Sequence, residues 1–146
     1  MQKMIVVTPI SFCDFTVEIV DFTERDLLDQ LQHHAGGYVE RLDTVIPAET
    51  HNIFYPKYGV LDLWLNEEGL MLQMLPNKLA TFLWRETGKT YNNPVVRETN
   101  DRSKSKQTLV GTTIITGGST KEGKTRGLSD TKIDWIHRVT HMLLNM

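Results

Sequence analysis

One segment constrains the fold of this chain more than any other: residues 109–130, with the sequence LVGTTIITGGSTKEGKTRGLSD. A run of β-branched residues typical of a strand enters a glycine-rich loop, and the loop leads into a segment with helical spacing. Within the loop, residues 118–125 match the pattern G-x-x-x-x-G-K-S/T of phosphate-binding P-loops.

The context of this match argues against a nucleotide-hydrolysing P-loop. Such a motif needs a buried strand before it and a helix that begins at its lysine, so that free backbone N–H groups and the helix dipole face the phosphates. The strand is predicted over 112–116, but Gly127 interrupts the expected helix, and the next N-cap signal is Ser129. The sequence therefore predicts a charged hairpin loop. Its cations are candidates for contact with an anionic ligand: Lys121, Lys124 and Arg126.

Composition indicates an ordinary globular domain. The 146 residues are 40% hydrophobic and 23% charged, which predicts one domain with a substantial core. A net charge of −2 argues against a general nucleic-acid or anionic-membrane binder. The single Cys13 cannot form an internal disulfide and is predicted to be a small buried hydrophobe, as expected in a reducing cytoplasm. No apolar run approaches the roughly 18 residues of a membrane span, so a cytoplasmic protein is expected.

Alternation of apolar and polar residues predicts a single α+β domain with a mostly antiparallel sheet. The expected strands are 3–8, 15–20, 38–42, 59–66, 70–75 and 109–116. The first two are expected to pair around a turn at 11–14. Strands 59–66 and 70–75 are expected to form a hairpin around the turn sequence NEEG.

One helix is predicted after the second strand, and a C-terminal helix is predicted to pack on the sheet. Thr23 is the expected N-cap of the first, which runs for about twelve residues to Gly36-Gly37. Its apolar face is expected to comprise Leu27, Leu28, Leu31 and Ala35. Ser129 is expected to cap the final helix, with an apolar stripe of Ile133, Ile136, Val139, Met142 and Leu143. Periodicity does not decide between helix and strand for 79–85.

Residues 85–107 form a long polar stretch, interrupted by Pro94 and without a sustained apolar period. A loop of this length in a small domain is either a surface insertion or a functional arm. As an arm, its cations and Tyr91 would cover a ligand or a partner.

No pattern identifies a catalytic or metal site. His137 and His141 are four residues apart but lack the glutamate of H-E-x-x-H motifs, which indicates a surface pair. A catalytic carboxylate pair would require two acids converging in a cleft. The available acids each fit an exposed strand face or a turn: Asp62, Glu67, Glu68, Asp43 and Glu40. Four aromatic residues either stack on a ring of a ligand or belong to the core and its rim: Trp64, Trp84, Tyr38 and Tyr91.

The order of several short motifs resembles the domain of unknown function 3846 family, small proteins of phages and of bacteria that carry mobile elements. These motifs are GGYVE at 36–40, NEEG at 66–69, LPNK at 75–78 and LVGT at 109–112, continuing to Gly117. The likeness covers about Met4 to Ile136 and departs at 85–107 and at 47–58, both longer here. It implies a compact α+β fold and a phage or prophage origin. It carries over no catalytic residue, because the family has none assigned.

Together these observations predict a non-enzymatic, phage-type accessory protein of the host bacterial cytoplasm, without cofactor or metal. It is expected to bind and sequester a small anionic, nucleotide-derived ligand, such as a bacterial immune signal, as a homo-oligomer. The expected ligand contacts are Tyr38, Asn77, Lys78, Lys124 and Arg126. Two alternatives stay open: a protein–protein inhibitor or regulator of a host enzyme, with 85–107 as the docking arm, and an enzyme that acts on nucleotides.

Overall fold

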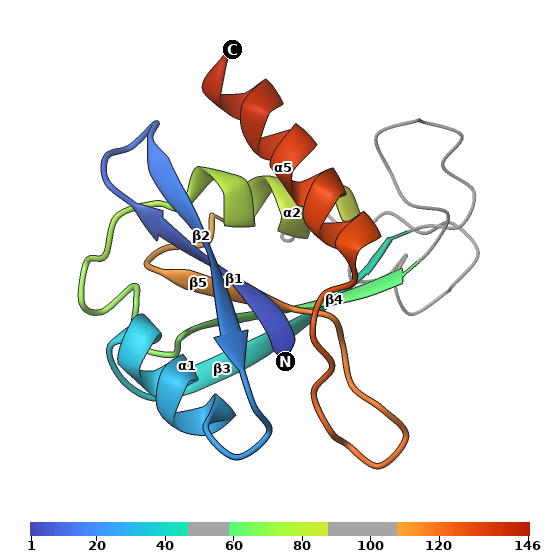
Figure 1. Cartoon of the computed structure of the whole chain (residues 1–146). Coiled ribbons are helices and arrows are strands. Elements are labelled where there is room, and N and C mark those ends of the chain that lie inside the picture. Colours follow the sequence, from blue (N-terminus) through green and yellow to red (C-terminus); the bar gives the residue numbers. More distant parts are fainter. Residues whose placement is uncertain (47–58, 88–107) are drawn as a thin grey trace, which may run out of the picture.

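A five-stranded sheet with strand order β2-β1-β5-β4-β3 is the framework of the molecule (Figure 1). The structure, a computed structural model, describes residues 1–46, 59–87 and 108–146. Every neighbouring pair of these strands is antiparallel. The strands are β1 (Gln2–Pro9), β2 (Phe15–Phe22), β3 (Val39–Ile46), β4 (Gly59–Asn66) and β5 (Thr113–Thr116).

Strand β1 shows why the sheet is covered on both faces. Its residues Met4, Ile5, Val6 and Val7 are consecutive, apolar and buried. Because successive side chains of a strand point to opposite faces, Ile5 and Val7 enter the larger core, while Met4 and Val6 enter the smaller one. A run of consecutive apolar residues is typical of a strand that is buried on both faces.

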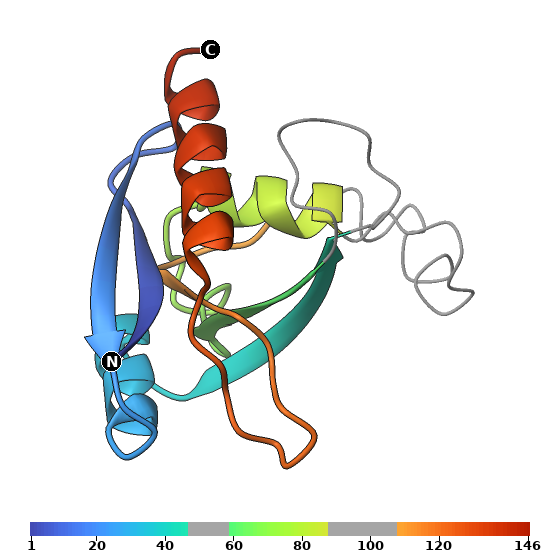
Figure 2. The ribbon, with the colours of Figure 1, turned by 45° about the vertical axis from the view of Figure 1, so that its right-hand side comes forward.

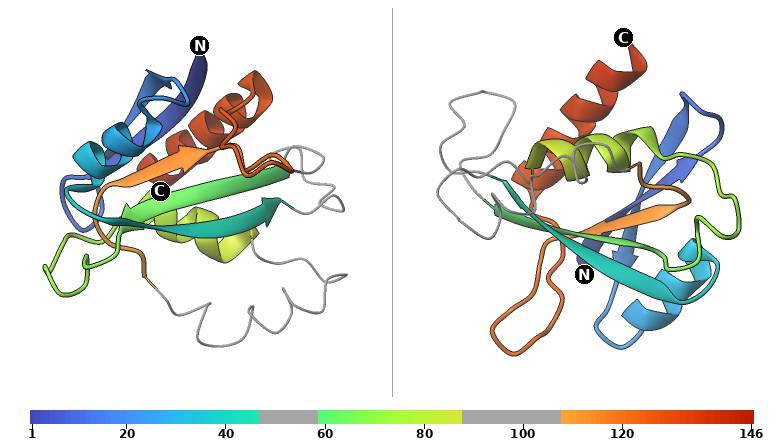
Figure 3. Two further views of the ribbon diagram at one scale, coloured as in Figure 1. Left: turned by 90° about the horizontal axis from the view of Figure 1, so that it is seen from below. Right: turned by 180° about the vertical axis from the view of Figure 1, so that it is seen from behind.

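Helices form the two outer layers. Helix α1 (Leu27–Ala35) covers the smaller core, and helices α2 (Lys78–Thr87) and α5 (Asp130–Leu144) cover the larger core on the opposite face. Figures 2 and 3 show α5 and α2 on one side of the sheet and α1 on the other. The predicted α+β fold, with one helix after the second strand and a C-terminal helix packed on the sheet, is confirmed.

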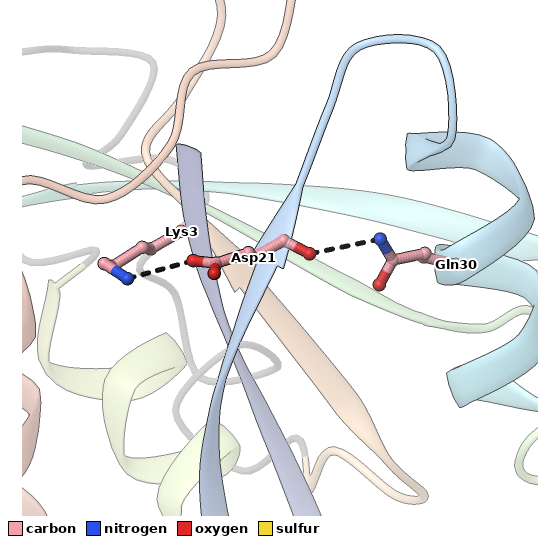
Figure 4. A network of polar contacts seen from close by, with 3 residues as sticks. All are labelled: Lys3, Asp21 and Gln30. Atoms are coloured by element: carbon pink, nitrogen blue, oxygen red, sulfur yellow. Dashed lines mark hydrogen bonds and ion pairs between the residues drawn. The ribbon is translucent and has the colours of Figure 1, made fainter. Parts of the chain in front are cut away.

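Side-chain contacts anchor α1 to the edge of the sheet (Figure 4). Gln30 of α1 donates a hydrogen bond from Nε2 to the carbonyl oxygen of Asp21 on β2, at 3.2 Å. The carboxylate of Asp21 in turn accepts from Lys3 Nζ on β1, at 2.9 Å. These contacts connect β1 and β2 to α1, the helix that covers them.

The predicted hairpin of 59–66 and 70–75 is wrong. Strand β4 pairs with β3 along one edge and with β5 along the other, so no edge is left for a further strand. Residues 67–73 form successive turns instead, in which Gln73 has a φ of 54°. The apolar side chains of Leu70, Met71 and Leu72 are consequently exposed. Strand β5 is also shorter than predicted, because Gly111 has a φ of 82° and interrupts the extended backbone.

The first helix begins one turn later than predicted. Thr23 and Asp26 form reciprocal hydrogen bonds, with Thr23 N to Asp26 Oδ1 at 2.8 Å and Asp26 N to Thr23 Oγ1 at 3.3 Å. This arrangement makes a turn before Leu27, and Leu28 points to solvent rather than into the core. The C-terminal end is as predicted, since Gly36 adopts the left-handed conformation and donates to Gln32 O.

The remaining segments follow the expected local signals, except in the burial of Trp135, Met142 and Cys13. Residues 79–85 are helical, within α2. Ser129 caps α5 as predicted, its Oγ accepting from Lys132 N, but Trp135 joins the buried stripe while Met142 is exposed. Cys13 is exposed rather than buried, because it lies in the β1–β2 turn, where its N–H donates to Ser11 Oγ.

Two sequence predictions lie outside the described residues. These are the polar loop, of which 88–107 is not described, and the loop over 47–58. Tyr91 belongs to the first of them. Among the helices of the described part of the chain, none combines the length and hydropathy needed to cross a membrane.

Candidate functional site

The glycine-rich loop over 117–127 folds back on itself as a hairpin. Gly117 N donates to Arg126 O at 2.8 Å, and Arg126 N donates to Gly118 O at 2.7 Å. A side chain at Gly117 would place its Cβ 2.3 Å from Gly127 O, so the two arms can approach this closely only without one. Because α5 begins at Asp130 and not at Lys124, the loop lacks the helix that a P-loop requires. The predicted charged hairpin is confirmed.

Charged side chains from four segments contact the hairpin or influence one another electrostatically near its root. Strand β3 contributes Arg41 and Asp43, β4 contributes Asp62, the returning arm of the loop contributes Arg126, and α5 contributes Lys132. We refer to these five residues as the charged site. They are brought together by the register of the sheet, which places Asp62 opposite Asp43 on one side and opposite Thr116, the last residue of β5, on the other.

Direct contacts hold the cations of the charged site in place. Arg41 Nε lies 3.2 Å from Asp43 Oδ1, and Arg41 Nη1 donates to Ser119 Oγ at 3.0 Å. Lys132 Nζ donates to Gly117 O at 3.3 Å. Arg41 and Lys132 are therefore both bonded to the hairpin loop, one from the sheet and one from α5.

Asp62 is the buried acid of the charged site. Only 1% of its surface is exposed, and Oδ2 has no hydrogen-bond partner among the described residues. Burial raises the pKa of its carboxyl to about 7, assisted by a hydrogen bond with Asp43 and by the negative charge of that residue. The nearby charges of Arg41 and Lys132 oppose this rise only in part. Asp62 is thus a carboxyl group that exchanges its proton near neutral pH.

The pKa of Lys132 is also perturbed, in the opposite direction from that of Asp62. Burial lowers the pKa of its ammonium group, and the positive charge of Arg126 lowers that pKa further, while Asp62 raises it. The fold therefore holds two cations close enough to repel each other. When Asp62 is protonated, Asp43 is the one carboxylate among the five residues of the charged site, against three cations.

Trp64 forms the wall beside these charges. Its Nε1 donates to Thr116 Oγ1 at 2.9 Å, and the guanidinium carbon of Arg41 lies 5.9 Å from its ring centroid. The ring also packs against the smaller core. Of the aromatic residues considered for stacking, Trp64 and Trp84 are thus both packed against the cores, and Tyr38 is exposed.

An open cavity of about 460 Å³ adjoins Arg126. Lys3 and the residues that begin α5, Ser129 and Asp130, also line it. The cavity has the size of a small-molecule site, which is commonly about 300–1,000 Å³. A ligand there would meet the side chain of Arg126 at the edge of the charged site.

The five residues predicted to bind the ligand are not brought together. Tyr38 precedes β3 and is 71% exposed, while Lys124 is exposed in the hairpin loop, 3.7 Å from Glu24. Lys78 lines a different cavity from Arg126, and the two cavities share no residue. Of the five, Arg126 alone belongs to the charged site.

Asn77 has a structural role. It is fully buried, and its Nδ2 donates to Val7 O and Gly111 O, both at 3.0 Å. Its Oδ1 accepts from Ala80 N at 3.0 Å in the first turn of α2. The side chain thus joins β1, the segment before β5 and α2, and these contacts occupy its amide.

The sequence analysis assigned Asp62 to an exposed strand face or a turn, which is wrong because the residue is buried, and it did not consider Lys132 and Arg41. One signal could have identified Asp62: an ionisable residue stands between Leu61 and Leu63 in a run, 59–65, that is otherwise without polar side chains. No comparable signal marks the partners of Asp62, because they come from distant segments. The histidine pair His137 and His141 is exposed on α5, and within the described ranges no group of three or more potential ligands could hold a metal ion.

Comparisons with protein-family models, with curated proteins and with solved structures each found no significant match to this chain.

Proposed function

We propose that this protein binds a small anionic, nucleotide-derived ligand at the charged site and sequesters it without changing it chemically. The supporting observation is that Lys132 and Arg126 both contact Gly117, Lys132 through Nζ to Gly117 O and Arg126 through its carbonyl oxygen, and that the positive charge of Arg126 lowers the pKa of the partly buried Lys132. Bringing cations together in this way costs free energy, and an anion bound between them would offset that cost. In the folded protein the protonated form of Asp62 favours the same ligand, because it adds no negative charge.

The resemblance in the motif order supports the setting of this proposal. A phage-type accessory protein would act in the cytoplasm of the host bacterium, where nucleotide-derived immune signals occur, and would bind its ligand in a pocket made by self-association. Lys124, in the same hairpin loop as Arg126, is exposed and could extend the cationic surface.

Calorimetric titration with ADP-ribose tests whether the charged site is the binding site. The diphosphate of this probe keeps the same charge between mildly acidic and mildly alkaline pH. Lys132→Gln and Arg126→Gln should each weaken binding by about tenfold or more, since a hydrogen bond to a charged group contributes on the order of 1.5–3 kcal/mol. Lys121→Gln removes one charge from the tip of the same loop and should leave the affinity nearly unchanged. Equal losses in all three variants would show general charge attraction instead of a site.

A second candidate function, a protein–protein regulator, has one specific observation in its favour. The side chains of Leu70 and Met71 are 76% and 80% exposed, next to the exposed Leu72. Adjacent exposed apolar residues of this size commonly mark a protein contact. The variant Leu70→Ser with Met71→Ser should abolish capture of a host protein if this function holds, whereas Leu28→Ser, at an exposed position on α1, should not.

The third candidate is an enzyme that acts on nucleotides, and the Asp43–Asp62 pair is the observation that would favour it. A buried carboxyl group with a raised pKa, such as Asp62, can serve as an acid or a base beside a second carboxyl group. A ligand recovered in altered form after incubation with the protein would identify this function.

A further inference from the structure

A second cavity lies on the face of the sheet that carries α2 and α5, apart from the charged site. Its volume is about 350 Å³, within the usual range of small-molecule sites. It is lined by Phe12, Pro76, Lys78, Thr81, Phe82, Arg85, Thr108 and Leu143. None of these residues belongs to the charged site, so this cavity would serve a ligand of its own.

The wall of the cavity is mostly apolar. Phe82 of α2 and Leu143 of α5 line it, and Phe12 reaches it from the β1–β2 turn. The side chain of Phe12 is 75% exposed, although transfer of a phenylalanine ring out of water is favourable. A ligand with an apolar body would cover this ring and Phe82 together.

Helix α2 presents one stripe of residues to the cavity. Lys78, Thr81, Phe82 and Arg85 follow the spacing i, i+3, i+4 and i+7, which places them on one face. The first and last of them are cations, and seven residues of helix separate them by about 10 Å. The stripe thus has a positive group at each end and an aromatic ring between them.

The two cations are not equivalent. Lys78 Nζ donates to Leu143 O at 3.3 Å, at the C-terminal end of α5, where the helix dipole is negative. Arg85 lies beside Thr108, with Nη2 donating to Oγ1 at 3.4 Å. Arg85 has further contacts of its own, but a guanidinium carries five N–H donors and can bind a carboxylate in addition to them. An anionic group is better placed at Arg85, whose planar fork matches a carboxylate, than at Lys78, beside the carbonyl groups of α5.

We propose that this cavity binds a medium-chain alkyl carboxylate. Its carboxylate contacts Arg85 and Thr108, and its alkyl chain lies along Phe82 toward Phe12 and Leu143. The alkyl body removes the exposed aromatic surface from water, and the single charge pairs with the arginine. The site is independent of the proposed function, because it shares no residue with the charged site.

Octanoate and 1-octanol form a matched pair of probes, since they have the same chain length and differ in charge. Titration followed by backbone amide shifts should show octanoate binding at α2 and the β1–β2 turn, about tenfold more tightly than 1-octanol. Arg85→Gln should remove this preference while 1-octanol binds as before, and Arg85→Lys should retain part of it. Phe12→Ala, at an exposed position, should weaken both probes. Lys121→Gln is the control for net charge and should change neither.

Three results would overturn the proposal: no shifts at the cavity with octanoate, equal affinity for the two probes, or an unchanged preference in Arg85→Gln. The amide spectrum of each variant shows whether it is folded. If Arg85→Gln is unfolded, the proposal is tested with Arg85→Lys and Phe12→Ala instead. An unchanged preference in Arg85→Lys together with unchanged binding of both probes in Phe12→Ala would then overturn it. Binding of ADP-ribose at the charged site is measured in the same samples, so that failure at one site is distinguished from failure at the other.

Discussion

Asp62 lies directly opposite Asp43 in the register of β3 and β4, and its Oδ2 has no hydrogen-bond partner among the described residues. Two acids in this relation cannot both ionise without cost, because burial and like charge disfavour the second negative charge. The pKa of about 7 at Asp62 follows from this arrangement. The charge of the site therefore changes by one unit in the physiological pH range.

Asp62→Asn should change how stability depends on pH. The unfolded carboxyl has a pKa near 3.8 and the folded one a pKa of about 7, so between these values the folded state binds the additional proton. The contribution of Asp62 to the free energy of unfolding of the parent protein should thus be largest at acid pH. This contribution should decrease as pH rises through that window. The slope is about 1.4 kcal/mol per pH unit at most. Asparagine does not titrate, so the variant should lack this decrease and be more stable than the parent at about pH 8. Urea unfolding at several pH values measures this, and an equal decrease in the variant would contradict the assignment.

Binding of an anion should depend on the same proton. With Asp62 ionised, a carboxylate competes with the ligand for Lys132, so ADP-ribose should bind about tenfold more weakly at about pH 8 than at about pH 6. In Asp62→Asn the affinity should stay the same at both pH values. Calorimetry on the two proteins provides the comparison. If the affinity of the parent protein is the same at both pH values, the protonation of Asp62 does not influence ligand binding.

Arg126→Gln should raise the pKa of the Lys132 ammonium group. The positive charge of Arg126 lowers that pKa, and its removal leaves burial as the cause that keeps the pKa below the ordinary value of 10.5. The rise should therefore be partial. NMR titration of the lysine side-chain carbon next to Nζ reports the pKa directly. Lys124→Gln, which removes an exposed cation of the same loop, should leave it unchanged.

Asn77→Ala should destabilise the fold by about 3 kcal/mol. It removes the cap at Ala80 N, worth on the order of 1 kcal/mol, and leaves buried carbonyl oxygens of Val7 and Gly111 without this donor. Urea unfolding measures the loss, with the exposed Lys121→Ala as a control. If Asn77→Ala retained full stability but lost ADP-ribose binding, the residue would be a ligand contact after all.

Local signals predicted much of the fold. The four apolar residues of β1, the Ser129 cap and the turn chemistry of the 117–127 loop each act over a few residues, and the structure contains all three. The failures arise where a distant segment decides the outcome. The run over 70–75 has strand-like composition, but β3 and β5 already occupy both edges of β4.

The charged site was less predictable than the fold for the same reason. Asp43 and Asp62 look like ordinary polar residues of two exposed strands, and only the pairing of β3 with β4 places them side by side. Lys132 lies in the first turn of α5, and its position over Gly117 depends on how the hairpin loop closes. Arg126 was identified because it belongs to the loop whose cations the sequence already marked.

The most direct test of sequestration is a capture-and-release measurement. The purified protein is mixed with nucleotides, cyclic dinucleotides and ADP-ribose derivatives, and the filtrate is analysed by chromatography before and after heat denaturation of the protein. The account predicts that at least one anionic compound disappears from the filtrate and returns intact on denaturation, and that Lys132→Gln captures less of it. A compound that returns altered, or a panel that stays entirely in solution, would contradict it.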